Sequence, residues 1–206
     1  MRINSSALLI AFLALDAVAK GPTGIGELNI GETRSEIDGL VSSGSIPLTE
    51  PLTPYVHKEY KPTPGEDQFS TKIKTPWSDE PLPAVLTFTN DQLIRIHVTL
   101  KDNSAMPDTV MGQIAAKYGD PKIDDKMTEE QCIYKNGANF KIKSGVINYT
   151  WTDTPPKTPV IETTVMIGSL EICPANLRHG SIGPIKFNSL TIGHQEQKKV
   201  DTPNPF

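Results

Sequence analysis

Four histidines are the side chains in this sequence best suited to acid–base or metal chemistry, and they stand far apart. They are His57, His97, His179 and His194. None forms a His-x-x-x-His pair or a Cys/His ligand spacing, so a zinc site would need ligands from remote loops. His97 alternates with Arg95 and Thr99, which favours a solvated residue on the outer face of a strand. A catalytic role for His97 is the alternative.

Paired carboxylates are the second candidate for chemistry, because a glycosidase needs only two acids that face one another across a cleft. Adjacent acids occur at four places: 66–67, 79–80, 124–125 and 129–130. No motif fixes their geometry, and acid pairs in polar connections are usually solvated surface. The sequence also lacks nucleophile-elbow, acylation and nucleotide-loop motifs. We therefore assign no catalytic residue and no metal ligand, and we expect no cofactor.

Cys132 and Cys173 are the only cysteines, and both lie in segments typical of strands. In an exported protein, two cysteines most simply form one disulfide. The chain-entropy model gives about 4 kcal/mol of stabilisation for a loop of roughly 42 residues. The alternative is a catalytic thiol, which would require a histidine within reach, and the sequence leaves this alternative open.

Export is predicted by the first nineteen residues. Arg2 precedes an apolar run over residues 7–15, which is as long as the hydrophobic region of a signal peptide and too short to cross a bilayer. Small residues at Ala17 and Ala19 predict cleavage between Ala19 and Lys20. We expect residues 20–206 to be periplasmic or secreted, without an integral membrane segment. A buried N-terminal helix is the alternative.

The charge of the chain excludes some classes of partner. The formal net charge is −4, and removal of residues 1–19 deletes Arg2 and Asp16 and leaves it unchanged. A mildly acidic domain lacks the basic surface that binding to nucleic acid or to an anionic membrane requires. The 18 prolines and 15 glycines indicate many turns and short elements rather than a helical bundle.

Residues 20–100 are predicted to hold a helix, a proline-rich segment and a β-hairpin. Thr33 and Glu36 form a capping-box pattern, and Ser42-Ser43-Gly44 ends the helix that it starts. Eight prolines between residues 47 and 83 predict a long irregular segment, because proline disfavours both helices and central strands. In residues 84–89 and 93–100 the side chains alternate with the period of two that is typical of half-buried strands, which predicts a β-hairpin. Its second strand would bury Ile94, Ile96, Val98 and Leu100 on one face.

Aromatic side chains within the proline-rich segment are the candidate partner-binding residues. They are Tyr55, Tyr60, Phe69 and Trp77. Aromatic groups in long loops usually pack on something. Here they pack either on the protein's own sheet or on a partner.

Residues 101–194 are predicted to form a second helix and an antiparallel meander. Apolar spacing favours a helix over residues 105–118, with Gly119 as its C-terminal cap residue and Pro121 beyond. Strands are expected at 131–135, 139–143, 146–152, 160–168 and 170–173, with a turn at Ser144-Gly145 and a polar connection before residue 131. A last strand pair would use residues 182–187 and 189–192. Residues 195–206 are expected to be a flexible tail.

The order of these elements predicts an α+β fold of antiparallel strands with two short amphipathic helices. A tandem of two helix-then-strands modules is one arrangement that this order allows. Residues 30–37 (IGETRSEI) and 117–121 (KYGDP) resemble the helix-start and helix-end signatures of small exported bacterial domains of the SmpA/BamE-like or β-lactamase-inhibitor-protein-like kind. This resemblance implies a layered α+β domain that binds other proteins. The chain departs from it by lacking a lipoprotein cysteine and by carrying the proline-rich insertion.

The leading functional hypothesis is an exported protein-binding protein, such as an inhibitor, an immunity factor or an envelope assembly factor. It rests on a disulfide-capable scaffold with an aromatic-bearing loop, because loops on a rigid sheet are where recognition concentrates. The alternative is a secreted hydrolase whose acid pair or Cys/His site is assembled from distant segments. A free Cys132 or a strongly perturbed carboxylate in a pocket would favour the hydrolase. An extracellular structural module is a third hypothesis.

Overall fold

A computed structural model describes residues 21–44, 48–56, 63–102, 105–153, 159–174 and 183–195. The predicted signal peptide with its cleavage site, His57, Tyr60, His179 and the tail beyond Gln195 lie outside these residues. Among the described residues, neither helix combines the length and the apolar composition that a membrane span requires.

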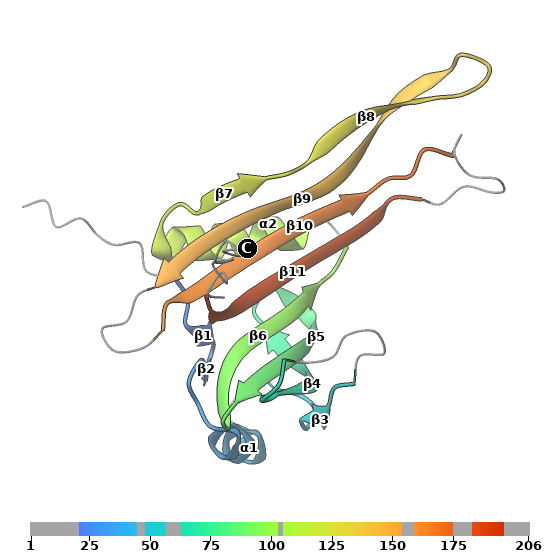
Figure 1. The fold of residues 1–206 in the computed structure, drawn as a ribbon. Helices are drawn as coiled ribbons and strands as arrows, with labels where there is room; N and C mark the ends of the chain where they lie inside the picture. The colour runs from blue at the N-terminus through green and yellow to red at the C-terminus, as the bar shows by residue number, and fades with distance from the viewer. Residues whose placement is uncertain are drawn as a thin grey trace, which may run out of the picture.

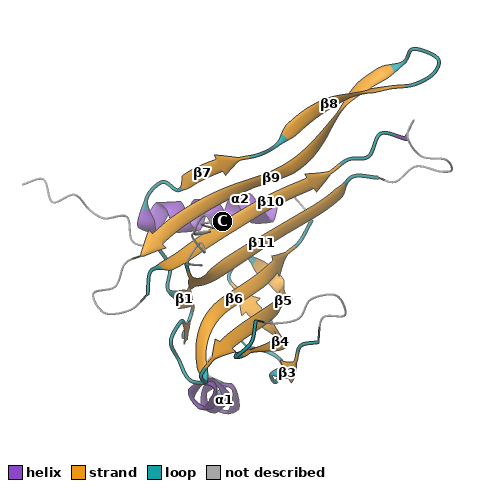
Figure 2. Ribbon diagram, in the orientation of Figure 1, coloured by secondary structure: helices purple, strands orange, loops and turns teal. Residues whose placement is uncertain are grey.

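The described chain is dominated by one nine-stranded antiparallel sheet (Figure 1). Across it run β3 (Thr53–Pro54), β4 (Glu66–Thr75), β5 (Ser78–Thr89), β6 (Gln92–Leu100), β11 (Ile185–His194), β10 (Ile161–Leu170), β9 (Asn139–Asp153) and β7 (Lys122–Asp125). A further strand, β8 (Thr128–Ile133), pairs with the first half of β9. With helices α1 (Arg34–Ser43) and α2 (Ala105–Tyr118), the predicted α+β class is confirmed (Figure 2). The strands β1 (Gly24–Ile25) and β2 (Leu28–Asn29) form a small separate pair.

Helix α1 begins where its capping box predicts. The Thr33 hydroxyl accepts a hydrogen bond from the backbone N–H of Glu36 (3.2 Å), and the Glu36 carboxylate accepts one from the backbone N–H of Thr33 (2.8 Å). Gly44 ends the helix in the left-handed conformation, with φ of 69°. Ile37 is fully buried and anchors the helix to the core.

Helix α2 has the predicted bounds and covers one face of β9, β10 and β11, behind them in Figure 1. Among the side chains of this helix, Met106, Val110 and Ile114 are buried. Gly119 accepts the left-handed φ of 85° that ends the helix, and Pro121 follows. The buried side chains of both helices join one core of 22 buried hydrophobic residues in the described chain, to which β4, β5, β6, β9, β10 and β11 contribute.

The expectation of an irregular segment from Pro47 to Pro83 is wrong, because β4 and the first half of β5 lie within it. Pro81 and Pro83 are exposed, in a part of β5 that is paired with β4. Pairing of β5 with β6 starts only at Ala84. The backbone nitrogens of the two prolines, which carry no N–H, can therefore lie on the unpaired side of the strand, where no hydrogen bond between strands is lost.

The predicted β5–β6 hairpin is confirmed, with one correction to its core face. Leu93 is buried and Ile94 is only half-buried, whereas Ile96 and Val98 are buried as expected. A register shift between Thr87 and Phe88 moves the alternation by one residue next to the turn.

Three boundaries in the second half also differ from the sequence prediction. β9 runs without a turn through Ser144-Gly145, where the absence of a side chain on Gly145 lets the carbonyl of Lys126, in the link between β7 and β8, approach. β11 is one strand and not a strand pair, because Asn188 is buried and its amide donates to the carbonyl of Lys101 (3.2 Å). The expected polar connection before residue 131 contains β7 and the start of β8.

Candidate protein-binding surface

One hairpin of the sheet extends beyond its neighbours. β7 and β8 pair with β9 in a single register, from Lys122 opposite Thr150 to Ile133 opposite Asn139. Pairing of β10 with β9 ends at Ser144. Residues 128–143 therefore project past the end of β10, at the upper right of Figure 1. We call residues 128–143 the arm, which reaches roughly 25 Å from Ser144 at about 3.3 Å per residue.

The arm ends in exposed apolar side chains, Ile133, Tyr134 and Phe140, which we call the arm tip. Their exposed fractions are 59%, 36% and 41%. The rings of Tyr134 and Phe140 lie 5.8 Å apart between centroids. The turn that holds them is closed by hydrogen bonds from the N–H of Tyr134 to the carbonyl of Ala138 (2.8 Å) and from the N–H of Gly137 to the carbonyl of Tyr134 (2.9 Å).

A second exposed apolar group lies near the base of the arm, on the sheet face opposite α2. Leu170 on β10 is paired with Ile185 on β11, and the ring of Phe187 lies over Gly168. We call Leu170, Ile185 and Phe187 the distal patch. Their exposed fractions are 42%, 46% and 39%. β6 pairs with β11 only from Asn188 onward, so β6 does not flank Ile185 and Phe187.

The exposed apolar residues of the described chain are concentrated at this end of the molecule. Nine large hydrophobic side chains are exposed in the described ranges, and six of them form the arm tip and the distal patch. The other three are Tyr55, Val56 and Ile123. Single exposed apolar residues are ordinary, whereas a cluster of them indicates an interaction surface.

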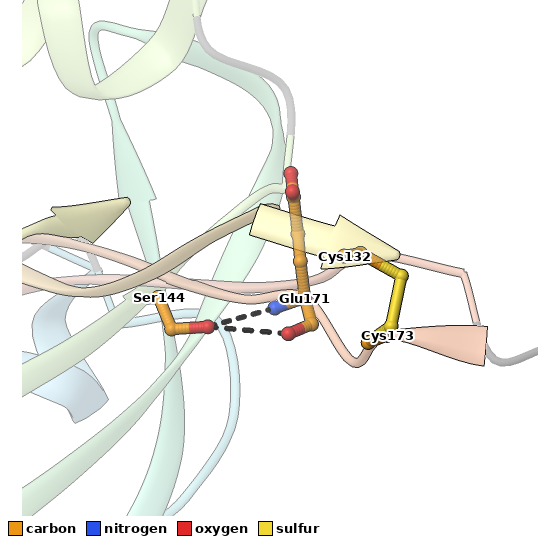
Figure 3. The surroundings of a disulfide bond; sticks show 4 residues. All are labelled: Cys132, Ser144, Glu171 and Cys173. Carbon is orange, nitrogen blue, oxygen red and sulfur yellow. Dashed lines mark hydrogen bonds between the residues drawn. A yellow bond between two sulfur atoms is a disulfide. The ribbon is translucent and has the colours of Figure 1, made fainter. Parts of the chain in front are cut away.

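The predicted disulfide between Cys132 and Cys173 is confirmed, with Cα atoms 5.3 Å apart. Figure 3 shows how it joins the arm to the chain that leaves β10. Close by, the Glu171 N–H donates to the Ser144 hydroxyl (3.3 Å), and that hydroxyl donates to the Glu171 carbonyl (3.2 Å). The alternative of a free catalytic thiol is wrong, because both cysteines are bonded.

In each of the two acid pairs of this region, one carboxylate forms ion pairs with lysine side chains. The carboxylate of Glu129 lies 2.9 Å from the ammonium groups of both Lys141 and Lys143. Asp124 is 2.8 Å from Lys126. Hydrogen bonds and charge from Lys143 and Lys141 lower the pKa of Glu129 to about 2. This perturbed carboxylate lies on the exposed arm and not in a pocket, so it does not have the setting of a catalytic acid.

The lysine pair predicts how the arm responds to acid. We expect Glu129 to titrate with a pKa of about 2, against 4.5 for the ordinary group. A lowered folded-state pKa means that the contribution of Glu129 to stability is present above pH 4.5 and is lost as the pH falls through about 2. Carboxyl chemical shifts followed by NMR would measure this, with Glu129→Gln identifying the signal. An ordinary pKa in the folded protein would mean that the two ion pairs do not form in solution.

The four sequence-predicted partner-binding residues are not equivalent in the structure. Phe69 is 7% exposed and belongs to the core, where its ring and that of Phe88 are nearly perpendicular, with centroids 5.7 Å apart. Trp77, in the turn between β4 and β5, packs against the same core. Tyr55 is exposed beside β4, and Tyr60 lies outside the described residues. The part of these four residues in partner binding stays a prediction.

The two histidines in the described ranges lie on the neighbouring strands β6 and β11. His97 is half-buried on the face of β6 opposite the core, with Nδ1 3.0 Å from the Thr191 hydroxyl. Burial, and then the charge of Arg95, lower the pKa of His97 and likewise that of His194. No group of three or more His, Cys, Asp or Glu residues in the described chain could hold a metal ion.

Sequence reasoning placed strands on both sides of the arm turn but did not recognise the arm tip. The available signal was Asn136-Gly137, a dipeptide typical of tight hairpins, flanked by large apolar residues at 133, 134 and 140.

Comparison of the chain with protein-family models, with curated proteins and with solved structures finds no match. The resemblance inferred from residues 30–37 and 117–121 therefore has no support.

Proposed function

We propose that this chain is an exported protein-binding protein, of the inhibitor, immunity or envelope assembly kind, and that it binds its partner through the arm tip and the distal patch. The observation that carries the proposal is that, of the nine large hydrophobic side chains exposed in the described chain, six lie at one end of the sheet. Removing such side chains from water favours association, and aromatic residues are frequent binding hot spots.

The construction of this end of the molecule supports the same proposal. The arm tip is carried by paired strands and a closed turn, and the disulfide ties the arm to the strand that ends in the distal patch. A surface that is ordered before binding loses less conformational entropy when the partner arrives. The arm tip can therefore bind a partner in the conformation that it already has.

We also propose that the fold is a tandem of two modules, α1 with β4, β5 and β6, and α2 with β9, β10 and β11. The support is the mirrored order of the strands, β4-β5-β6 followed by β11-β10-β9, with β6 and β11 at the junction. In this view β7 and β8 extend the second module, and the described residues of the first module contain no extra strand of comparable length. The arm is then the main departure from a repeated plan, and such departures are where function concentrates.

Substitution of the arm tip tests the proposal. We expect the triple variant Ile133→Thr, Tyr134→Thr, Phe140→Thr to remain folded and to bind its partner at least tenfold more weakly, because it loses apolar contact area while keeping residues that favour strands. Residues 20–206 would first be used to capture a stoichiometric partner from periplasmic and secreted fractions of its source and its competitors. Titration calorimetry would then measure the affinity of each variant for the purified partner.

Ile123→Thr is the matched control, because Ile123 and Ile133 are both 59% exposed and lie on β7 and β8, which pair with β9 in one register. It should change the affinity less than twofold. Tyr55→Ala tests the sequence-predicted residue in the same assay. Equal affinity of the triple variant and the native chain would remove the arm tip from the binding surface, and the absence of any stoichiometric partner would remove the proposed function.

A further inference from the structure

The disulfide lies outside the main core. Among the residues that the structure describes, Cys132, Ile142 and Cys173 form a separate cluster of three buried residues, whereas the main core has 22. Within the arm, Cys132 and Ile142 are buried and every other residue from 128 to 143 is exposed. A two-stranded hairpin that buries so little is only marginally stable in water. The arm therefore depends on what clamps it to the sheet.

The clamps lie at two levels along the arm. At its base, the N–H of Lys143 donates to the Glu171 carboxylate (2.8 Å), and the N–H of Glu171 donates to the carbonyl of Lys143 (3.2 Å). Nearer the tip, the clamp is the disulfide from Cys132 to Cys173, which packs with Ile142. The hydrogen bond from Lys143 to the Glu171 carboxylate is exposed and competes with water, so the disulfide is the stronger of the two clamps.

The main core does not rely on this cluster. Trp151, the core residue of β9, stands nine positions from Ile142 in the sequence, which is roughly 30 Å along a strand. The core residues of β6, β10 and β11 belong to the same buried cluster as those of α2. Loss of the disulfide would expose the cluster of three and leave the main core covered.

We infer that the Cys132–Cys173 disulfide is a latch on the arm, so that the binding surface is assembled only where the two cysteines are oxidised. The inference rests on the proposed function, because the latch regulates that same surface. A chain with reduced cysteines would keep its sheet but present the arm tip on a loose hairpin. Binding would then begin only after export into an oxidising compartment.

The chemistry of the latch is thiol–disulfide exchange with a dithiol. One thiolate of the dithiol attacks a cysteine sulfur, the Cys132–Cys173 bond breaks, and a mixed disulfide forms. The other cysteine leaves as a thiolate in that step. The second thiolate of the dithiol then attacks the dithiol's own sulfur in the mixed disulfide and releases the cysteine bonded to it, so the dithiol leaves as a cyclic disulfide. Two electrons and two protons convert the cystine to two thiols, and oxidation reverses each step.

Hydrogen–deuterium exchange on the folded full chain, with and without dithiothreitol, tests the latch. After labelling for seconds to minutes, amides of residues 128–143 should exchange at least tenfold faster in the reduced protein. Amides of β6, β10 and β11 should stay unexchanged in both states. Cys132→Ala with Cys173→Ala should reproduce the loose arm without reagent, and dithiothreitol should then have no further effect.

Two results would overturn the inference. If β6 and β11 lose protection together with the arm, the disulfide holds the core and is not a local latch. If the arm keeps its protection after reduction, strand pairing alone orders it. The exchange measurement needs no partner, so failure of the latch is distinct from failure of the proposed function, which the arm-tip variants test by affinity.

Discussion

We expect Trp151→Ala to lower the free energy of unfolding by about 3–5 kcal/mol, the largest effect of any single substitution considered for this chain. Trp151 is 2% exposed and is the largest fully buried side chain in the described residues. Its removal leaves a cavity between β9 and the end of α2. It also removes the hydrogen bond from the indole N–H to the carbonyl of Gly119 (2.8 Å). Chemical denaturation followed by circular dichroism would measure the change without relying on tryptophan fluorescence.

Trp151→Phe is the matched control, because it keeps an aromatic ring in the core and removes mainly the hydrogen bond. We expect it to cost about 1–2 kcal/mol. A loss below about 1 kcal/mol for Trp151→Ala would mean that the site collapses around the smaller side chain, contrary to the close packing of the core.

Trp151 also explains why the first described residues are ordered. Gly21 lies against the backbone of Trp151, where a Cβ atom would stand only 3.2 Å from its carbonyl carbon. The carbonyl of the next residue, Pro22, accepts a hydrogen bond from the buried Thr163 hydroxyl (2.8 Å). Ile25 and Leu28 then enter the core. The segment just after the predicted cleavage site is therefore part of the fold, which no local signal in the sequence indicated.

Features with local causes were predictable from the sequence. The capping box at Thr33, the glycine after Tyr118 and the pairing of two cysteines each depend on a few residues or on the cysteine count, and all three are confirmed. The two helices and the β5–β6 hairpin follow from the same kind of signal. Their identification needs no knowledge of which strands become neighbours.

The sequence predictions were wrong where the local structure depends on which strands pair with one another. Pro83 is tolerated in β5 because β6 pairing starts one residue later, and Ser144-Gly145 stays extended because strands flank it on both sides. The arm exists because β10 pairing ends at Ser144 while β9 begins at Asn139. Strand ends of this kind are set by long-range pairing, so the sequence could place Phe140 on a strand but could not show that the strand leaves the sheet.

We expect Cys132→Ala combined with Cys173→Ala to lower the free energy of unfolding by about 2–4 kcal/mol. The cysteines are 41 positions apart, and the cross-link restrains the unfolded chain over that whole loop. This effect on the unfolded state is separate from the local contacts of the arm, so a peripheral disulfide can carry a large share of global stability. Urea denaturation of the native chain and the double variant would measure the difference.

Dithiothreitol supplies the control, because it should shift the urea midpoint of the native chain towards that of the double variant and leave the double variant unchanged. If the two midpoints coincide before any reagent is added, loop closure contributes nothing, and residual structure in the unfolded state already holds the two ends together. A midpoint that falls with the arm still protected would instead separate the two roles of the bond. The cross-link would stabilise the fold through the unfolded chain, and β8–β9 pairing alone would keep the arm tip in place for its partner.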